Sequence, residues 1–302
     1  MKKEIKNKPA SISARLMNIA RNGGIDFDSI LLRYFQERLL KRLSVSDFAD
    51  SLILKGGLLL LCLKMPESRP TKDIDFLSEL KNDINGIQNI FRKISAIKYD
   101  DGVEFIPSSI ESERITEDAD YEGIRLKIEG TLGKIRKRLQ IDIGFGDVIS
   151  SEAAFISFPS LIGDPLKLNA YPVEYIISEK FEAMIKLEMI NSRMKDFYDV
   201  YYLSLSYDFD GDKLKQAIEA TFQRRQTPMP ENPLIFRTEF RSDKMRQKMW
   251  ASFLRKLRLP DVNQEFSEVM LKITAFLEPI VSSINEKSEM NKSWNAKKGT
   301  WE

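Results

Sequence analysis

Two aspartates spaced two residues apart, Asp73 and Asp75, are well suited to metal-assisted chemistry. They lie in the stretch DIDF, which reads as a β-strand. Because successive side chains of a strand point to opposite faces, both carboxylates share one face, and the apolar Ile74 and Phe76 share the other. Carboxylates grouped in this way can hold Mg²⁺ and, through it, a triphosphate. An Asp-x-Asp pair also occurs in ordinary turns, so the surrounding sequence has to show whether this pair binds a metal.

A pair of glycines, Gly56 and Gly57, follows an apolar run over 52–54 that predicts a buried strand. Glycine allows positive φ and has no Cβ to obstruct a ligand. The apolar run over 58–63 predicts a buried helix, and the first amide N–H groups of such a helix favour phosphate. The order glycine turn, helix, acidic strand therefore favours binding of a nucleotide.

A third acid, Asp142, lies in a strand predicted over 139–145, whose odd-numbered positions are apolar. Asp142 falls on the opposite face, where an unpaired buried charge would lose its hydration at a high cost. A cluster of Asp73, Asp75 and Asp142 on neighbouring strands is tolerable only when cations bind between the carboxylates. The alternatives are an edge-strand Asp142 that faces water, or Asp147 as the third acid.

Polar residues on two later helices form another candidate group. Lys180 lies beside the apolar stripe of a helix predicted over 173–189, and Asp196 and Asp199 share a face of the next helix. On the pattern alone, Lys180 reads as a solvated surface lysine, and the aspartates read as a helix cap and a salt-bridge partner.

The composition narrows the chemistry. The 302 residues include no histidine, which excludes Ser-His-Asp catalysis, His-ligated zinc and an imidazole base. The net charge of +2 does not by itself indicate that the protein binds nucleic acid, so any basic surface must be local. The single cysteine, Cys62, and the absence of a signal-peptide core or membrane-length apolar span predict a cytoplasmic protein that does not enter membranes.

Alternating strand and helix patterns predict an α/β fold: a mixed β-sheet flanked by helices over 1–164, a helical C-terminal lobe over 165–285, and a loose polar tail over 286–302. We expect the active site in the cleft between the sheet domain and the lobe. Arg38, Lys41 and Arg42 are predicted to be solvated cations near a helix end. The segment with Lys134 and the cations at 136–138 is predicted to be a turn that either holds RNA phosphates or is merely solvated.

These motifs resemble the AbiEii/AbiGii toxin family of the nucleotidyltransferase superfamily. The Gly-Gly turn is followed by R-x-T-x-D-I-D-F, matched from Arg69 through Thr71 to Phe76, and the stretch IDIGFGD is similar to the region of the family's third acid. An E-K-x-x-A helix is matched by Glu179, Lys180 and Ala183, and R-x-K-D-x-x-D is matched from Arg193 to Asp199. The resemblance covers roughly residues 12–202.

The resemblance implies a toxin of bacterial abortive-infection and toxin–antitoxin systems. Such a protein would be a nucleotidyltransferase that uses an NTP and one or two Mg²⁺ ions, acts on tRNA or another RNA, and is neutralised by an antitoxin encoded nearby. Asp73, Asp75 and Asp142 would hold the metal. The nucleotide would be bound by Gly56, Gly57, Arg69, Thr71, Lys180, Arg193 and Asp199. Lys180 and Asp196 would join the three metal-binding acids as catalytic residues, with Asp196 or Asp199 orienting Lys180.

Two alternatives stay open at this point. A nucleotidyltransferase that modifies a small molecule, as antibiotic-modifying relatives do, would favour an acidic cleft. A degenerate module that only binds a nucleotide or a partner has little reason to retain the three acids.

Overall fold

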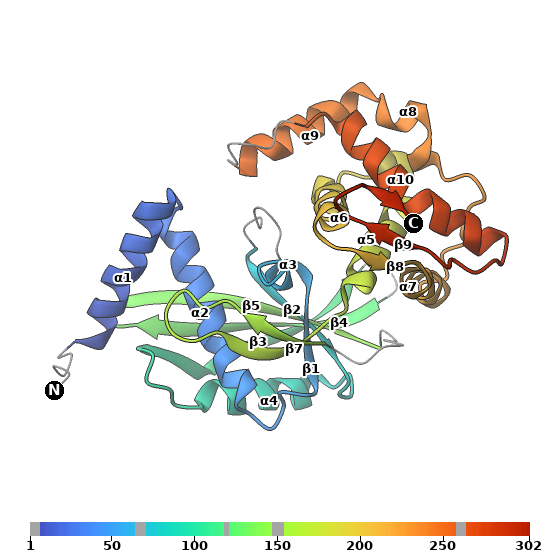
Figure 1. Cartoon of the computed structure of the whole chain (residues 1–302). Coiled ribbons are helices and arrows are strands. Elements are labelled where there is room, and N and C mark those ends of the chain that lie inside the picture. The colour runs from blue at the N-terminus through green and yellow to red at the C-terminus, as the bar shows by residue number, and fades with distance from the viewer. Residues whose placement is uncertain (1–6, 64–70, 118–120, 147–153, 258–263) are drawn as a thin grey trace. The chain divides into compact units, whose positions relative to one another are not determined.

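The computed structural model describes residues 7–63, 71–117, 121–146, 154–257 and 264–302. The described residues form two compact units, the first up to Tyr171 and the second from Pro172 (Figure 1). The sequence placed this division at residue 164. Within the described ranges, none of the helices combines the length and hydropathy needed to cross a bilayer.

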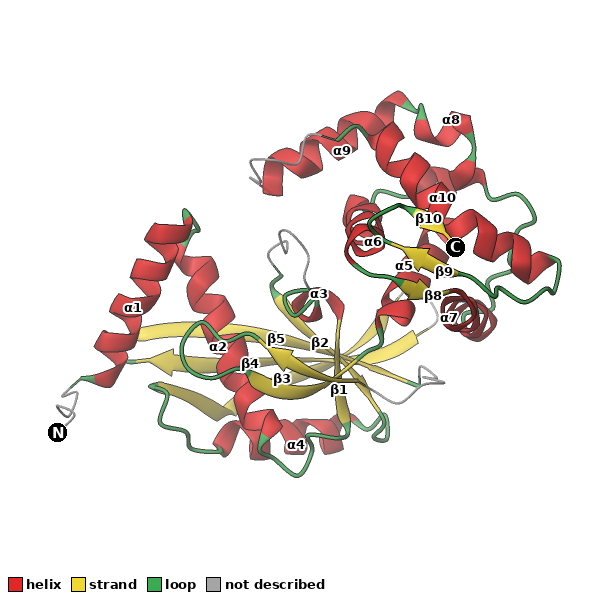
Figure 2. Ribbon diagram, viewed as in Figure 1, coloured by secondary structure: helices red, strands yellow, loops and turns green. Residues whose placement is uncertain are grey.

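The first unit is built on a seven-stranded mixed sheet with the order β3-β4-β5-β2-β1-β7-β6. Figure 2 shows the strands in yellow. The strands are β1 (Leu52–Lys55), β2 (Asp73–Ser78), β3 (Val103–Glu117), β4 (Tyr121–Leu132), β5 (Ile135–Phe145), β6 (Ala154–Phe158) and β7 (Leu166–Ala170). The pairs β2–β5 and β1–β7 are parallel, and the other neighbours are antiparallel. This arrangement confirms the predicted α/β class with a mixed sheet flanked by helices.

The sheet has one apolar face and one polar face near its centre. On β4 and β5 the alternating apolar residues are opposite one another in the register, as in the pair Leu126 and Ile141, and both are fully buried. On β2, Phe76 contacts Phe91 of helix α4 (Ile84–Ala96) with 6.3 Å between ring centroids. The intervening residues of these strands therefore point away from α4, and the period of two in the sequence predicted this division correctly.

The other helices of this unit are α1 (Lys8–Gly23), α2 (Phe27–Ser44) and the short α3 (Gly56–Leu59). Side-chain oxygens cap the longer ones: Asp26 accepts a hydrogen bond from the Ser29 N–H at the start of α2, and Asp83 accepts from Gly86 at the start of α4. Helix α2 packs against β5, β7 and α4.

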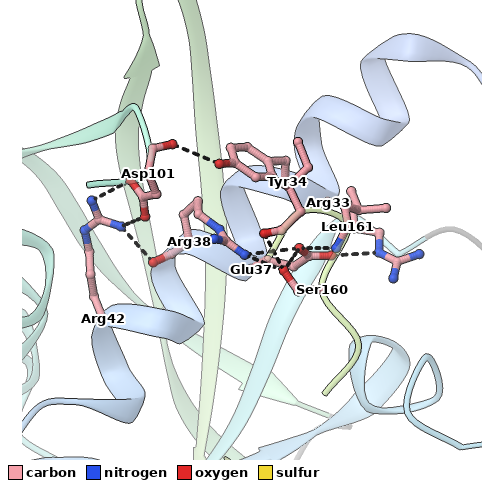
Figure 3. A network of polar contacts seen from close by, with 9 residues as sticks. Arg33, Tyr34, Glu37, Arg38, Arg42, Asp101, Ser160 and Leu161 are labelled. Carbon is pink, nitrogen blue, oxygen red and sulfur yellow. Dashed lines mark hydrogen bonds and ion pairs between the residues drawn. The ribbon is translucent and has the colours of Figure 1, made fainter. Parts of the chain in front are cut away.

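The prediction of solvated cations on α2 is wrong for Arg38 and Arg42. Arg42 is 2% exposed, donates to both carboxylate oxygens of Asp101 at 2.8 and 3.2 Å, and donates to the Val103 carbonyl at 2.7 Å. Arg38 is 6% exposed and donates to the Ser160 hydroxyl at 2.7 Å. These contacts fix α2 to segments far along the chain, which a reading of α2 alone does not reveal (Figure 3).

A buried carboxylate, Glu37, lies in the same network. It accepts hydrogen bonds from the Leu161 N–H at 2.9 Å and the Ser160 hydroxyl at 3.2 Å, and it forms an ion pair with Arg33 at 3.1 Å. Burial raises the pKa of Glu37, although the Leu161 N–H and the nearby arginines lower it in part. Glu37 thus joins α2 to the segment between β6 and β7.

The second unit is mainly helical. Its helices are α5 (Val173–Leu187), η1 (Glu188–Ile190), α6 (Met194–Ser206), α7 (Gly211–Arg224), η2 (Leu234–Phe236), α8 (Thr238–Arg241), α9 (Lys244–Leu257) and α10 (Phe266–Asn285). Phe197 of α6 lies at the centre of its core, with ring contacts to Phe240 of α8 and Phe266 of α10.

The prediction of a loose tail over 286–302 is wrong. Strands β9 (Ser293–Asn295) and β10 (Thr300–Trp301) join β8 (Phe209–Asp210) in a small antiparallel sheet. Trp294 is 1% exposed and donates its indole N–H to the Ser204 carbonyl at 2.6 Å, while Trp301 stacks on Phe276. A Cβ at Gly211 would lie 2.5 Å from the Met290 carbonyl, so this close approach requires glycine. The two tryptophans supply the apolar surface that orders a segment of polar composition.

Candidate active site

Three carboxylates converge on the polar face of the first unit's sheet. In the parallel pairing of β2 with β5, Asp75 is directly opposite Asp142, and Asp73 is opposite Gln140. Residues opposite each other share a face, so Asp73, Asp75 and Asp142 lie together, on strands that are about 4.8 Å apart. Asp142 is 6% exposed, and the other two are half-buried. This is the arrangement that the strand pattern predicted.

The glycine turn lies directly against this acidic face. Lys55 of β1 pairs in register with Asp75, and Gly56 follows with a φ of 68°. A Cβ on Gly56 would lie 1.9 Å from the Asp75 carboxylate oxygen Oδ2, so only glycine leaves room for that side chain. Gly57 is buried in the first turn of α3. Glycine is thus required at position 56 so that the Asp75 side chain fits. The sequence alone did not give this reason for the glycine.

An arginine that the sequence analysis did not single out holds the third acid. Arg125 of β4 is opposite Asp142 and donates from Nε to Oδ1 at 2.8 Å and from Nη2 to Oδ2 at 2.7 Å. Gln140 Nε2 also donates to Asp142 Oδ2, at 3.2 Å. The hydrogen bond to Asp142 raises the pKa of Arg125 above its usual range, and the charge of Asp73 acts in the same direction. The sequence could have indicated Arg125 as a site residue, because it lies on the polar face of an alternating strand.

Helix α2 holds the segment that leads into β2, the strand that carries Asp73 and Asp75. Gln36 is buried and donates from Nε2 to the Lys72 carbonyl at 3.0 Å. The Thr71 hydroxyl lies 3.5 Å from the Asp73 carbonyl oxygen. Arg69 and Asp147, the other sequence candidates in this region, lie outside the described residues.

A second polar cluster joins α5 and α6 inside the second unit. Lys180 Nζ lies 2.9 Å from Asp196 Oδ1 and 2.7 Å from Asp199 Oδ2, and Arg193 Nε lies 2.6 Å from Asp196 Oδ2. Both aspartates are fully buried, and the Lys180 side chain is 15% exposed. Both acids therefore contact Lys180, where the sequence suggested one or the other. Glu179, beside Lys180, forms an ion pair with Arg225 at 3.8 Å.

Opposing effects act on the pKa of Asp196. Burial by itself raises this pKa, but the positive charges of Lys180 and Arg193 outweigh burial and hold it below its usual value. Asp196 is therefore a carboxylate at neutral pH, and its ion pair with Lys180 holds that side chain in position.

The predicted basic turn does not gather free cations. The turn contains Lys134, whereas the next three cations lie inside β5 and each is ion-paired: Arg136 with Glu129, Lys137 with Asp28 and Arg138 with Glu111. Each of these three cations thus already has an acidic partner within the protein. Of the two readings offered by the sequence, the solvated turn fits these contacts better.

The acidic face fits a divalent cation by the chemistry of its donors, since Mg²⁺ prefers carboxylate oxygens. Within the described ranges, no three acidic or thiol groups are already arranged around a common metal position. Both oxygens of Asp142 are bonded to Arg125. Asp73, Asp75 and Asp142 are the carboxylates that would hold such an ion, and Asp142 would have to exchange Arg125 for it.

A mixed sheet with a glycine turn, and with carboxylates on a parallel pair of strands, fits the arrangement that the resemblance to nucleotidyltransferases implies. The chain belongs to the AbiEii family: the model described as the nucleotidyl transferase AbiEii toxin of type IV toxin–antitoxin systems matches residues 38–272. As a member of that family, the chain is a nucleotidyltransferase.

Solved structures from Helicobacter pylori are similar in fold. The crystal structure of JHP933 has a TM-score of 0.50 and 16% sequence identity, covering 87% of this chain and 95% of that one. A candidate nucleotidyltransferase from H. pylori has a TM-score of 0.48 and 14% identity, covering 88% of this chain and all of its own length. No curated protein matches the chain.

Proposed function

We propose that this chain is a toxin that transfers a nucleotide from an NTP to the 3′ end of an RNA, with tRNA as the acceptor, and that it thereby blocks translation and bacterial growth. The observation that carries the proposal is the register of β2 and β5, which sets Asp75 opposite Asp142 with Asp73 on the same face. Membership of a type IV toxin–antitoxin family supports both the toxic effect and a cognate antitoxin as partner.

We assign the metal to the acidic face: Asp73, Asp75 and Asp142 would hold one or two Mg²⁺ ions. Such ions, when bound, neutralise the triphosphate and polarise the phosphorus that is attacked. The chain's own part is to place the carboxylates before substrate arrives, and the close contact of Gly56 with Asp75 does this at one of them.

The remaining site residues would bind the nucleotide and handle charge. Gly56 and Gly57 expose backbone amides to the phosphates, and Arg69 and Thr71 add donors. Lys180 balances the negative charge that develops on the departing pyrophosphate, held for that role by Asp196 and Asp199. Asp142 accepts the proton of the attacking hydroxyl in this scheme.

The transfer reaction tests the proposal directly. Each of the four NTPs, labelled on the α-phosphate, is incubated with Mg²⁺, total tRNA and either the wild type or Asp75→Asn. We expect label in RNA with the wild type and none with the variant. Glu113→Gln, an exposed acid of β3 that pairs with Lys127, is the matched control and should label RNA normally.

The same assay separates the alternatives. Label in a small molecule from a cell extract, with none in RNA, would replace the RNA acceptor by a small-molecule acceptor. Calorimetry with NTP and Mg²⁺ that gives no metal-dependent heat would indicate a degenerate module that only binds a partner.

A further inference from the structure

Helix α9 carries an unusual charge pattern. Its fourteen residues, KMRQKMWASFLRKL, contain Lys and Arg but no acid. Lys244, Lys248 and Arg255 are exposed, and at about 100° per residue they fall within about 40° of one another around the helix axis. Lys256 is also exposed, on the flank of this group. These four residues are called the α9 basic face below.

The opposite side of α9 is anchored in the second unit. Trp250 is 2% exposed, and its ring contacts Phe266 of α10 and Phe253 of α9 itself, while Phe253 also contacts Tyr198 of α6. Arg246 is 3% exposed and donates to the Glu188 carbonyl at 3.2 Å. The α9 basic face therefore points away from the unit's own core.

The four cations of this face have no acidic partner among the described residues. None of them takes part in a hydrogen bond or an ion pair with that part of the chain. This differs from β5, where each of the cations at 136–138 is matched by an acid. Unneutralised like charges on one helix repel one another, and a polyanion relieves that repulsion.

The surroundings of these cations favour a phosphate backbone over other partners. The apolar side of α9 is already packed, so the helix cannot insert it into a lipid surface. Between the cations lie Gln247, Ala251 and Ser252, and Met245, which is 70% exposed, also lies beside them. These residues include none of the aromatic anchors that dominate protein interfaces. Along the axis, Lys244 and Lys248 are separated by about 6 Å, and Lys248 and Arg255 by about 10 Å, at 1.5 Å per residue.

We propose that the α9 basic face binds the sugar-phosphate backbone of the RNA acceptor. This inference rests on the proposed function, because it names where that substrate is held. The contacts are electrostatic and independent of sequence, so they give affinity without selecting particular bases. The face would supply the local basic surface that the predicted turn before β5 does not.

The test is RNA binding measured against salt concentration. The variant replaces all four cations (Lys244→Gln, Lys248→Gln, Arg255→Gln, Lys256→Gln). The control replaces four other exposed lysines of the second unit that have no ion pair among the described residues (Lys213→Gln, Lys272→Gln, Lys287→Gln, Lys297→Gln). Both changes lower the net charge by the same amount. Equal thermal unfolding midpoints for the two proteins and the wild type would verify that folding is intact.

Total tRNA is the probe. We expect the α9 variant to lose at least tenfold in affinity at low salt, and the slope of log K against log salt to fall by about 3, since each phosphate contact with a single strand contributes about 0.7. The control should keep most of the wild-type slope. Equal slopes and affinities for the variant and the control would overturn the proposal.

Parallel transfer assays keep this proposal separate from the proposed function. If the wild type labels RNA while the two quadruple variants behave alike, the α9 assignment fails and the function stands. If RNA binding depends on α9 but no RNA is labelled, the binding surface stands and the transfer function fails. If the α9 variant loses binding to the antitoxin and not to RNA, the face belongs to an acidic protein partner and the proposal is wrong.

Discussion

Two bidentate arginine–aspartate pairs among the described residues of the first unit differ in their surroundings. Arg42 and Asp101 have side chains that are only 2% and 4% exposed, and Arg42 also donates to the Ile97 and Val103 carbonyls. The side chains of Arg125 and Asp142 are 32% and 8% exposed, and two more carboxylates share their face. Both pairs are bidentate with nearly the same distances.

The comparison teaches that contact geometry alone does not separate a structural pair from a functional one. The Arg42 pair is closed, because further hydrogen bonds within the protein occupy the guanidinium. We expect the Arg125 pair to be open to exchange, because one partner is a third exposed and the two further carboxylates on the same face would attract another cation. The expected consequence is that one pair controls stability and the other controls activity.

The largest effect should come from breaking the closed pair. Arg42→Met leaves the Asp101 carboxylate buried without its cation, and we expect the free energy of unfolding to fall by about 3–5 kcal/mol. Urea unfolding measures this change. Arg92→Met removes an exposed arginine of α4 that bonds only to the neighbouring Asn89 among the described residues, and should change stability by less than about 0.5 kcal/mol.

A loss below about 1 kcal/mol for Arg42→Met would show that Asp101 finds other partners, and the two pairs would no longer differ in kind. The folded fraction of Arg42→Met should transfer nucleotide at the wild-type rate.

The open pair should show the reverse pattern. Asp142→Asn removes a charge from the acidic face, and we expect the transfer rate to fall at least 100-fold, or about 2.7 kcal/mol in the activation barrier. Its free energy of unfolding should change by less than about 1 kcal/mol, because the pair is partly exposed. Asp101→Asn is the matched control, since it should destabilise the fold and leave the transfer rate of folded protein unchanged.

Full transfer activity in Asp142→Asn would contradict the assignment of the third acid. Asp147 would then be the next candidate to test.

Removing the arginine of the open pair should sharpen the comparison further. Arg125→Gln takes away the cation that competes for Asp142, so we expect Mn²⁺ affinity to rise about tenfold, or about 1.4 kcal/mol. Calorimetry in the absence of nucleotide measures this affinity. Lys127→Gln, which removes the next cation on the same face of β4, is the control and should leave metal affinity within about twofold.

Weaker Mn²⁺ binding in Arg125→Gln would show that the arginine positions Asp142 for the ion. The pair would then be a fixed part of the site, as the Arg42 pair is a fixed part of the fold.

Local patterns in the sequence were sufficient for the central strands and for the acids that share their polar face, but they did not predict β6 and β7. Strands alternate strictly, so the placement of Asp75 and Asp142 follows from the period of two once the strands are neighbours. The same alternation places Arg125 on the polar face. A strand pattern does not give the register between strands, however, and the pairing of Arg125 with Asp142 depends on how β4 and β5 align. The sequence therefore predicted the acids and missed their arginine.

The errors share a physical origin in long-range contacts. Arg42 is buried because Asp101, 59 positions away, receives it, and the tail is ordered because Trp294 bonds to Ser204, 90 positions away. Charge and polarity in a local window predicted solvent exposure in each case. The contact with a distant partner instead buries the side chain.

The smallest effect concerns Asp196, which is buried like Asp101 but holds Lys180, a residue of the proposed site. Its pKa is held low in the folded protein, so the stability it contributes is fully present above the pKa of an unfolded aspartate, about 3.9. That contribution is lost as the pH falls through the lower folded pKa. Between pH 5 and pH 3, the unfolding midpoint of the wild type should therefore fall more steeply than that of Asp196→Asn, which has no proton to gain at this site. Glu239→Gln, an exposed acid of α8, is the control and should follow the wild-type curve. Parallel curves for the wild type and Asp196→Asn would mean that Lys180 and Arg193 stabilise the carboxylate no more than water does, and Lys180 would then be free to leave Asp196 for a nucleotide at little cost.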